Sequence, residues 1–192
     1  MTDRESKLFW QKFYLDRNNA MRKGLLFSLL LCKLLAEAQS QKTPCTTNLV
    51  YRQFDFWIGD WDVYALNGKK AGESKVDLIL DSCIILENWK GANGYAGKSF
   101  NTFNATTNQW QQTWVDNVGG TTEYLEGKGE NNKMVFRTKP FSFSNDTIAV
   151  RRLSFYRLSP DTVRQHGEIT KDDGKTWKTE YDLEYRRKKT EP

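Results

Sequence analysis

Alternation of side-chain character along the chain is the feature that most constrains its fold. After Pro44, almost every segment alternates or is rich in β-branched and aromatic residues, and turn-forming residues separate the segments at short intervals. No stretch after Pro44 sustains a helical period, although residues 51–58 could form one or two turns. The pattern predicts ten strands, at residues 61–66, 72–80, 83–90, 98–104, 110–116, 121–127, 133–138, 147–158, 162–170 and 178–187.

These strands are expected to form a single all-β domain over residues 45–187. Their connections are short, which makes sequential strands antiparallel neighbours. About ten antiparallel strands without covering helices must hide their edges, either in a sandwich or in a closed or nearly closed barrel. We favour the barrel, because at this strand number it is wide enough to hold side chains or one small ligand.

Residues 21–38 have the pattern of a secretory signal peptide. Two cations precede an apolar run, and a small-x-small pattern ends at Ala38, where we expect cleavage. The run contains Lys33 and falls well short of the roughly twenty apolar residues of a bilayer span. Residues 1–20 are then interpreted as an extension that precedes the true translation start, Met21. The mature protein is predicted to be secreted or periplasmic, without a membrane span.

The net charge of the whole chain, +5 at pH 7, raises the question of nucleic-acid binding. Residues 41–192 carry 22 Lys and Arg against 20 Asp and Glu, so most of the excess lies in the leader. The one dense basic run, at residues 186–189, is typical of a solvated chain end. Nucleic acid is therefore not expected as a partner.

Removal of the leader leaves two cysteines, Cys45 and Cys83. In an oxidising compartment, such a pair is expected to form a disulfide, and two buried thiols are the alternative. The bridge would close a loop of about forty residues and stabilise the fold by roughly 4 kcal/mol in the chain-entropy model.

The stretch FDFWIGDWDV, residues 54–63, concentrates aromatic rings and aspartates around one glycine. Within it, Gly59-Asp60-Trp61 resembles the G-x-W signature of lipocalin-like barrels, the calycin superfamily. The resemblance implies that Trp61 plugs the closed end of the barrel and that an arginine near the end of the last strand, Arg186 or Arg187, packs across it. An indole supplies a large apolar area, and a stacked guanidinium adds about 1 kcal/mol or more when partly desolvated.

The resemblance extends beyond this signature. FDFWIGDWDV, SCIILENWKGANGYAGKSFNTFN, WQQTWVDNVGG and VRQHGEITKDDGKTW are similar in order and spacing to a bacterial family of secreted, uncharacterised proteins that open with FDFWxGxWxV. The likeness covers nearly all of residues 45–187 and implies a calycin-like barrel, but that family carries no established activity to transfer. Its members share the two cysteine positions seen here as Cys45 and Cys83, which supports the disulfide.

Tryptophan and polar side chains share a face on two of the predicted strands, because residues two apart on a strand face the same side. A polar or acidic group inside a barrel is costly without a partner. Such groups therefore either satisfy one another in a structural network or face a ligand, with the tryptophans as stacking walls and the polar groups as anchors. The candidate ligand-binding residues are Glu87, Trp89, Gln112, Trp114, Asp116 and Gln165.

The leading hypothesis is a barrel that binds a small, partly apolar organic ligand at these residues, without a cofactor. One alternative is an enzyme that uses Glu87 and Asp116 as an acid–base pair, since carboxyls in unlike environments can divide the two roles. Another is a haem-binding barrel similar to nitrobindins, which ligate haem through a histidine on a late strand. His166, the only histidine, lies in such a strand. A single histidine excludes a histidine-rich metal site, and no metal is expected.

Residues 170–177, TKDDGKTW, fit the Asp-box pattern S/T-x-D-x-G-x-x-W, which is known mainly from sialidase propellers. A propeller needs repeated copies, and this chain has one. We therefore interpret the stretch as a turn in which an aspartate caps a hairpin and the tryptophan packs beneath it. No glycosidase activity follows from it.

Overall fold

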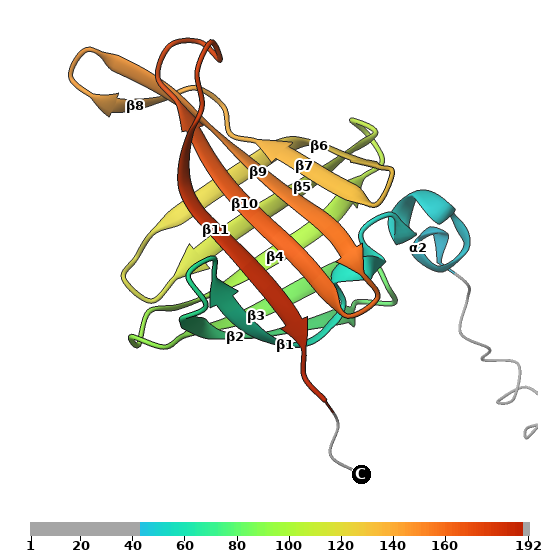
Figure 1. Cartoon of the computed structure of the whole chain (residues 1–192). Coiled ribbons are helices and arrows are strands. Elements are labelled where there is room, and N and C mark those ends of the chain that lie inside the picture. The colour runs from blue at the N-terminus through green and yellow to red at the C-terminus, as the bar shows by residue number, and fades with distance from the viewer. Residues whose placement is uncertain (1–42, 190–192) are drawn as a thin grey trace, which may run out of the picture. The chain divides into compact units, whose positions relative to one another are not determined.

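The structure, a computed structural model, describes residues 43–189, so the expectations for residues 1–20 and 21–38 lie outside the described part. Within residues 43–189, three short helices precede eleven strands (Figure 1). The helices are α2 (Pro44–Thr47), η1 (Leu49–Arg52) and η2 (Asp55–Trp57). The strands are β1 (Gly59–Ala65), β2 (Lys70–Ile79), β3 (Ile84–Gly91), β4 (Ala96–Asn104), β5 (Gln109–Asp116), β6 (Thr121–Glu130), β7 (Lys133–Arg137), β8 (Phe141–Ser144), β9 (Thr147–Ser159), β10 (Thr162–Thr170) and β11 (Lys178–Arg187). Within residues 43–189, no helix combines the length and the apolarity needed to cross a membrane.

Ten of the eleven strands form a closed antiparallel barrel. Each strand from β1 to β6 pairs with the next, and β7 pairs with β9. The ring closes because β9 pairs with β10, β10 with β11, and β11 with β1. The predicted all-β barrel of about ten strands is confirmed.

β8 lies outside this ring and is absent from the predicted set of strands. β9 is long enough to carry two neighbours on the same edge: its residues 152–156 pair with β7, and its residues 147–149 pair with β8. β8 therefore extends beyond one end of the barrel, close to the turn between β10 and β11 (Figure 1). Its four residues are too few for a period-two pattern to stand out in the sequence.

The opposite end of the barrel is closed by the segment that precedes β1. Phe54 and Trp57 are fully buried, and their stacked rings lie 5.1 Å apart between centroids. Phe155 of β9 meets the Phe54 ring at 4.9 Å. The indole nitrogen of Trp61, also fully buried, donates to the backbone carbonyl of Trp57 at 2.9 Å. The aromatic rings of the stretch 54–63 thus form core.

Arg187 is the arginine that covers the Trp61 ring, at 4.3 Å from its centroid. Arg186 faces the other side of β11 and lies over Tyr64 instead, because adjacent residues of a strand point in opposite directions. The approach of Arg187 requires a glycine at position 59. Gly59 has a φ of +145°, and a Cβ there would lie 2.1 Å from Nη1 of Arg187.

The helical segment is tied to the barrel wall. Cys45 of α2 and Cys83, in the turn between β2 and β3, form a disulfide with Cα atoms 4.9 Å apart. The Thr43 hydroxyl donates to the backbone carbonyl of Asp81 in the same turn, at 3.1 Å. The segment that closes the barrel is therefore held at its start by the disulfide, and its end continues directly into strand β1.

The Asp-box-like stretch forms the turn between β10 and β11. The Oδ1 atom of Asp172 accepts hydrogen bonds from the backbone nitrogen of Thr176 and from the hydroxyl of Thr170, both at 2.8 Å. The hydrogen bonds from Thr176 contribute most, and that from Thr170 less, to lowering the pKa of Asp172 to about 2. Trp177 packs against the guanidinium of Arg152, 4.1 Å from the ring centroid. The stretch is a capped turn.

Candidate functional site

The inward-facing side chains of the barrel change character in layers from the closed end to the open end. On β3, Ile85 lies in the core, Glu87 is buried above it, and Trp89 is partly exposed. β5 repeats this order with Trp110, Gln112, Trp114 and Asp116. The core is therefore followed by a polar layer and then by an aromatic layer at the open end.

Glu87 is the centre of the polar layer. Its side chain is 2% exposed and lies within hydrogen-bond distance of three hydroxyls on three other strands. Ser74 and Ser99 donate at 3.0 Å each, and the Tyr185 hydroxyl lies 3.2 Å away. Burial raises the pKa of Glu87 to about 7, and the three hydrogen bonds oppose that rise because they favour the charged form.

Amide side chains extend this layer on both sides of Glu87. On one side, Gln112 donates to Asn101 at 2.7 Å, and Asn101 donates to the Ser99 hydroxyl at 3.1 Å, so the Ser99 proton points to Glu87. On the other side, the Tyr185 hydroxyl lies 2.8 Å from Oε1 of Gln165. A hydroxyl carries one proton, so Tyr185 can donate to Glu87 or to Gln165 but not to both.

Above the polar layer, the open end of the barrel holds a cavity of about 410 Å³. This volume lies within the range of small-molecule sites, roughly 300–1,000 Å³. All six candidate residues from the sequence line this one cavity: Glu87, Trp89, Gln112, Trp114, Asp116 and Gln165. Sequence analysis missed further lining residues, which include Tyr124, Arg151, Glu180, Tyr181, Leu183 and Tyr185.

Two of the aromatic walls lie flat against glycines of neighbouring strands. A Cβ at Gly97 of β4 would lie 2.3 Å from the Trp114 ring, and a Cβ at Gly167 of β10 would lie 2.4 Å from the Tyr181 ring. Only glycine leaves room for rings this close to the backbone. The rings are thereby held back against the barrel wall, which keeps the centre of the cavity open.

Charged groups surround the rim. Asp116 caps the turn between β5 and β6: its Oδ1 accepts from the backbone nitrogens of Gly120 at 2.7 Å and Val118 at 3.1 Å. Its Oδ2 accepts from the Tyr95 hydroxyl at 3.0 Å. These bonds, led by that from Gly120, lower the pKa of Asp116. Across the rim, Arg151 and Glu180 form a two-pronged ion pair at 2.8 and 3.1 Å.

His166 does not line the cavity. It faces outward from β10, where its Nε2 lies 2.9 Å from the Thr179 hydroxyl and its Nδ1 lies 3.6 Å from Glu168. Asp182 approaches the ring from β11 at 4.0 Å. A ligand inside the barrel is thus out of reach of His166, and the geometry gives the haem hypothesis no support. Among the described residues, no group of three or more His, Cys, Asp or Glu is placed to hold a metal ion.

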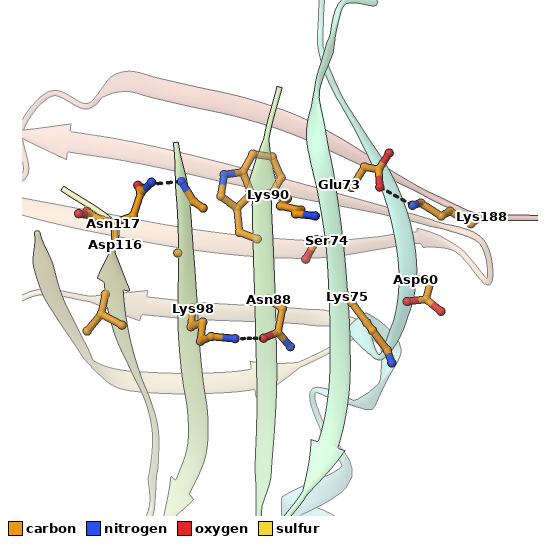
Figure 2. A pocket seen from close by; sticks show the side chains of 14 residues that line it. Asp60, Glu73, Ser74, Lys75, Asn88, Lys90, Lys98, Asp116, Asn117 and Lys188 are labelled. Carbon is orange, nitrogen blue, oxygen red and sulfur yellow. Dashed lines mark hydrogen bonds and ion pairs between the residues drawn. The ribbon is translucent and has the colours of Figure 1, made fainter. Parts of the chain in front are cut away.

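A second hollow, of about 540 Å³, lies along strands β1 to β5 and is drawn in Figure 2. The labelled side chains of Lys75, Asn88 and Lys98 project from the strands on the side toward the viewer, and Lys98 is bound to Asn88 (Figure 2). Glu73 is paired with Lys188 at 2.7 Å. The lining of this hollow includes exposed lysines, such as Lys75, Lys90 and Lys98. The smaller cavity inside the barrel is the one in which the candidate residues converge.

The missed lining residues come from strands whose patterns look ordinary. On β11, Tyr181, Leu183 and Tyr185 alternate with acidic residues. The same alternation is found in any barrel strand that has one buried face and one solvent-exposed face. Arg151 follows an apolar pair on β9 and precedes a second arginine, so the sequence alone does not reveal which of the two faces inward. The sequence signal that could have identified Tyr181 is the glycine at position 167 on the neighbouring strand. The two residues are opposite each other in the pairing of β10 with β11.

No family model and no curated protein matches the chain. The fold itself, a closed ten-stranded antiparallel barrel, is consistent with a lipocalin-like architecture.

Proposed function

We propose that this protein is a secreted or periplasmic barrel that binds a small, partly apolar organic ligand in the cavity at its open end. The observation that carries the proposal is the convergence of aromatic walls and polar groups on one cavity of about 410 Å³. Ligand sites combine mostly apolar walls with a few placed polar groups in this way. The disulfide fits an extracytoplasmic location, because such bonds persist in oxidising compartments.

The cavity is also built differently from a filled core. At the closed end, the core residues are fully buried. Trp57 and Trp61, for example, have no solvent-accessible surface. Trp89 and Trp114 are only partly buried, although each has a large apolar surface. Aromatic area left uncovered inside a barrel is area that a ligand can cover.

The acid–base enzyme stays a prediction. Burial raises the pKa of Glu87 and hydrogen bonds lower that of Asp116, which is the kind of split that acid–base pairs use. However, both oxygens of Asp116 already accept bonds from the turn that it caps and from Tyr95. No second function is therefore proposed.

Binding can be tested with N-phenyl-1-naphthylamine, a neutral apolar dye whose fluorescence rises in apolar sites. Thr122 lines the cavity, and its neighbour Thr121 on β6 is exposed. Thr122→Trp should fill the cavity and weaken dye binding at least tenfold, whereas Thr121→Trp should leave it unchanged. Absence of saturable dye binding to the wild type, or equal loss in both variants, would contradict the proposed site.

A further inference from the structure

The cavity is acidic although the chain as a whole is basic. Its lining carries three carboxyl groups, Glu87, Asp116 and Glu180, and one cation, Arg151. That cation is bound on two nitrogens by Glu180. The two remaining carboxyls, Glu87 inside and Asp116 at the rim, have no salt bridge among the described residues.

Glu87 is the group that most needs a cation. It is 2% exposed, and the hydrogen-bond donors recorded for its carboxyl group are the neutral hydroxyls of Ser74 and Ser99 and, when it does not donate to Gln165, that of Tyr185. A buried carboxylate is costly unless it is paired, and neutral donors compensate only part of the lost hydration. Yet Glu87 borders the cavity, so a ligand can reach the place that a lysine or arginine would occupy in an ordinary ion pair.

The layer above Glu87 suits the rest of such a ligand. Trp89, Trp114, Tyr124 and Tyr181 surround the path from the open end to the polar layer. Aromatic faces attract ammonium groups and also cover apolar carbon, so they fit both parts of an amine with an apolar body. An anionic ligand would instead meet three carboxyls and an arginine that is already occupied.

We propose that the ligand is an organic cation, an amine on an apolar body, which enters the barrel with its ammonium group toward Glu87. This inference rests on the proposed function and adds the ligand's chemical class and orientation. Gln112 and Gln165, which flank Glu87 in the polar layer, would supply carbonyl oxygens as further acceptors for the ammonium protons.

The test compares three compounds that differ only in their polar end: 4-phenylbutylamine, 4-phenylbutan-1-ol and 4-phenylbutanoate. Each competes with N-phenyl-1-naphthylamine for the wild-type protein at pH 8, where an alkyl amine with a pKa of about 10 stays protonated. The amine should compete at least tenfold better than the alcohol, and the carboxylate should be the weakest of the three. Dye binding reports the proposed function, and the order of the competitors reports the charge preference.

Glu87→Gln keeps the shape of the side chain and removes the charge. In this variant the amine should lose its advantage, to within threefold of the alcohol, while the affinity for the alcohol changes less than threefold. Glu123→Gln, which removes an exposed carboxyl of β6, should keep the full preference and controls for the overall charge. The alcohol's affinity also shows whether Glu87→Gln has left the cavity intact.

A second measurement uses pH. The groups that face Glu87 are Ser74, Ser99, Tyr185 and Gln165, and Tyr181 and Arg151 lie further along the cavity. The preference for the amine should grow as pH rises from 5 to 8 in the wild type and stay flat in Glu87→Gln. Equal or better competition by the alcohol or the carboxylate, or failure of all three while the dye binds, would overturn the inference and leave the proposed function standing. Failure of the dye itself would count against both.

Discussion

The guanidinium of Arg187 lies 4.3 Å from the ring centroid of Trp61, and the two residues are opposite each other in the pairing of β1 with β11. The contact joins the first barrel strand to the last at the closed end. Arg187 also donates to the backbone carbonyl of Ile58 at 3.2 Å. The pair thus covers the aromatic floor of the barrel and fixes the point at which the chain enters β1.

Loss of the Trp61 ring should damage stability. Trp61→Ala empties a fully buried site and should lower the free energy of unfolding by about 3 to 5 kcal/mol. Arg187→Ala should cost about 1 kcal/mol or more, and Arg186→Ala, on the exposed side of the same strand, clearly less. Urea denaturation of the three variants measures this order. A well-folded Trp61→Ala with weaker dye binding would mean that Trp61 belongs to the ligand site.

A side chain at position 59 should destabilise the fold through the backbone and through Arg187. Gly59→Ala adds a Cβ at a φ of +145° and forces Arg187 to move, since that Cβ would lie 2.1 Å from Nη1. We expect a loss of at least 1 kcal/mol from the backbone alone. In the double variant Gly59→Ala/Arg187→Ala the steric part disappears, so the combined loss should be smaller than the sum of the single losses. Additive losses would show that the two residues do not interact.

Removal of the disulfide should destabilise the barrel. Cys45→Ser or Cys83→Ser should lower the free energy of unfolding by about 2 to 5 kcal/mol under oxidising conditions. Addition of a reductant should lower the melting temperature of the wild type and leave that of either variant unchanged. Identical melting of the wild type with and without reductant would contradict the bridge.

Glu87 should make stability depend on pH. Its pKa is about 7 in the folded chain, against 4.5 for an unperturbed carboxyl. Between these values the folded state binds more protons than the unfolded state, so the free energy of unfolding falls as pH rises from about 4.5 to 7 and then levels off. The fall attributable to this group is about 3 kcal/mol. Glu87→Gln should remove it, which denaturation at pH 5 and pH 8 can check. A wild type and a Glu87→Gln variant that change equally over this interval would rule out the shift.

Trp114 and Trp110, four residues apart on β5, offer a matched comparison of the cavity and the core. Trp110 is 2% exposed and should cost about 3 to 5 kcal/mol as Trp110→Ala. Trp114 borders the cavity, so Trp114→Ala creates less new void and should lower the melting temperature far less. Asp116→Asn keeps an acceptor for the turn and should also cause a small drop. Large decreases in melting temperature for both Trp114→Ala and Asp116→Asn would mean that Trp114 and Asp116 belong to a closed structural network and not to a ligand site.

The strands and their closure could be read from the sequence because alternation and turn residues act locally. Ten of the eleven strands were predicted within a few residues, and the strand that was missed, β8, pairs with a segment of β9 beyond the barrel. Period-two spacing also placed Glu87 with Trp89 on one face of β3, and Trp114 with Asp116 on one face of β5, but it did not distinguish a structural network from a ligand-binding wall. By contrast, the parts of the site on β9 and β11 depend on which strands lie across the barrel from one another. The choice of Arg187 over Arg186 likewise needed the register with Trp61.

The glycines behind the aromatic walls affect the size of the cavity, and other residues supply the polar groups that line it. Gly97 and Gly167 are not among the residues that line it, yet they set how far the rings of Trp114 and Tyr181 stand from its centre. A methyl group at Gly167 would meet the Tyr181 ring first and would push that ring into the cavity, whereas at Gly97 it would also lie 2.6 Å from the backbone oxygen of Val115. Position 167 therefore governs how bulky a molecule the cavity accepts, and Glu87 and the hydroxyls around it govern which polar group the cavity binds.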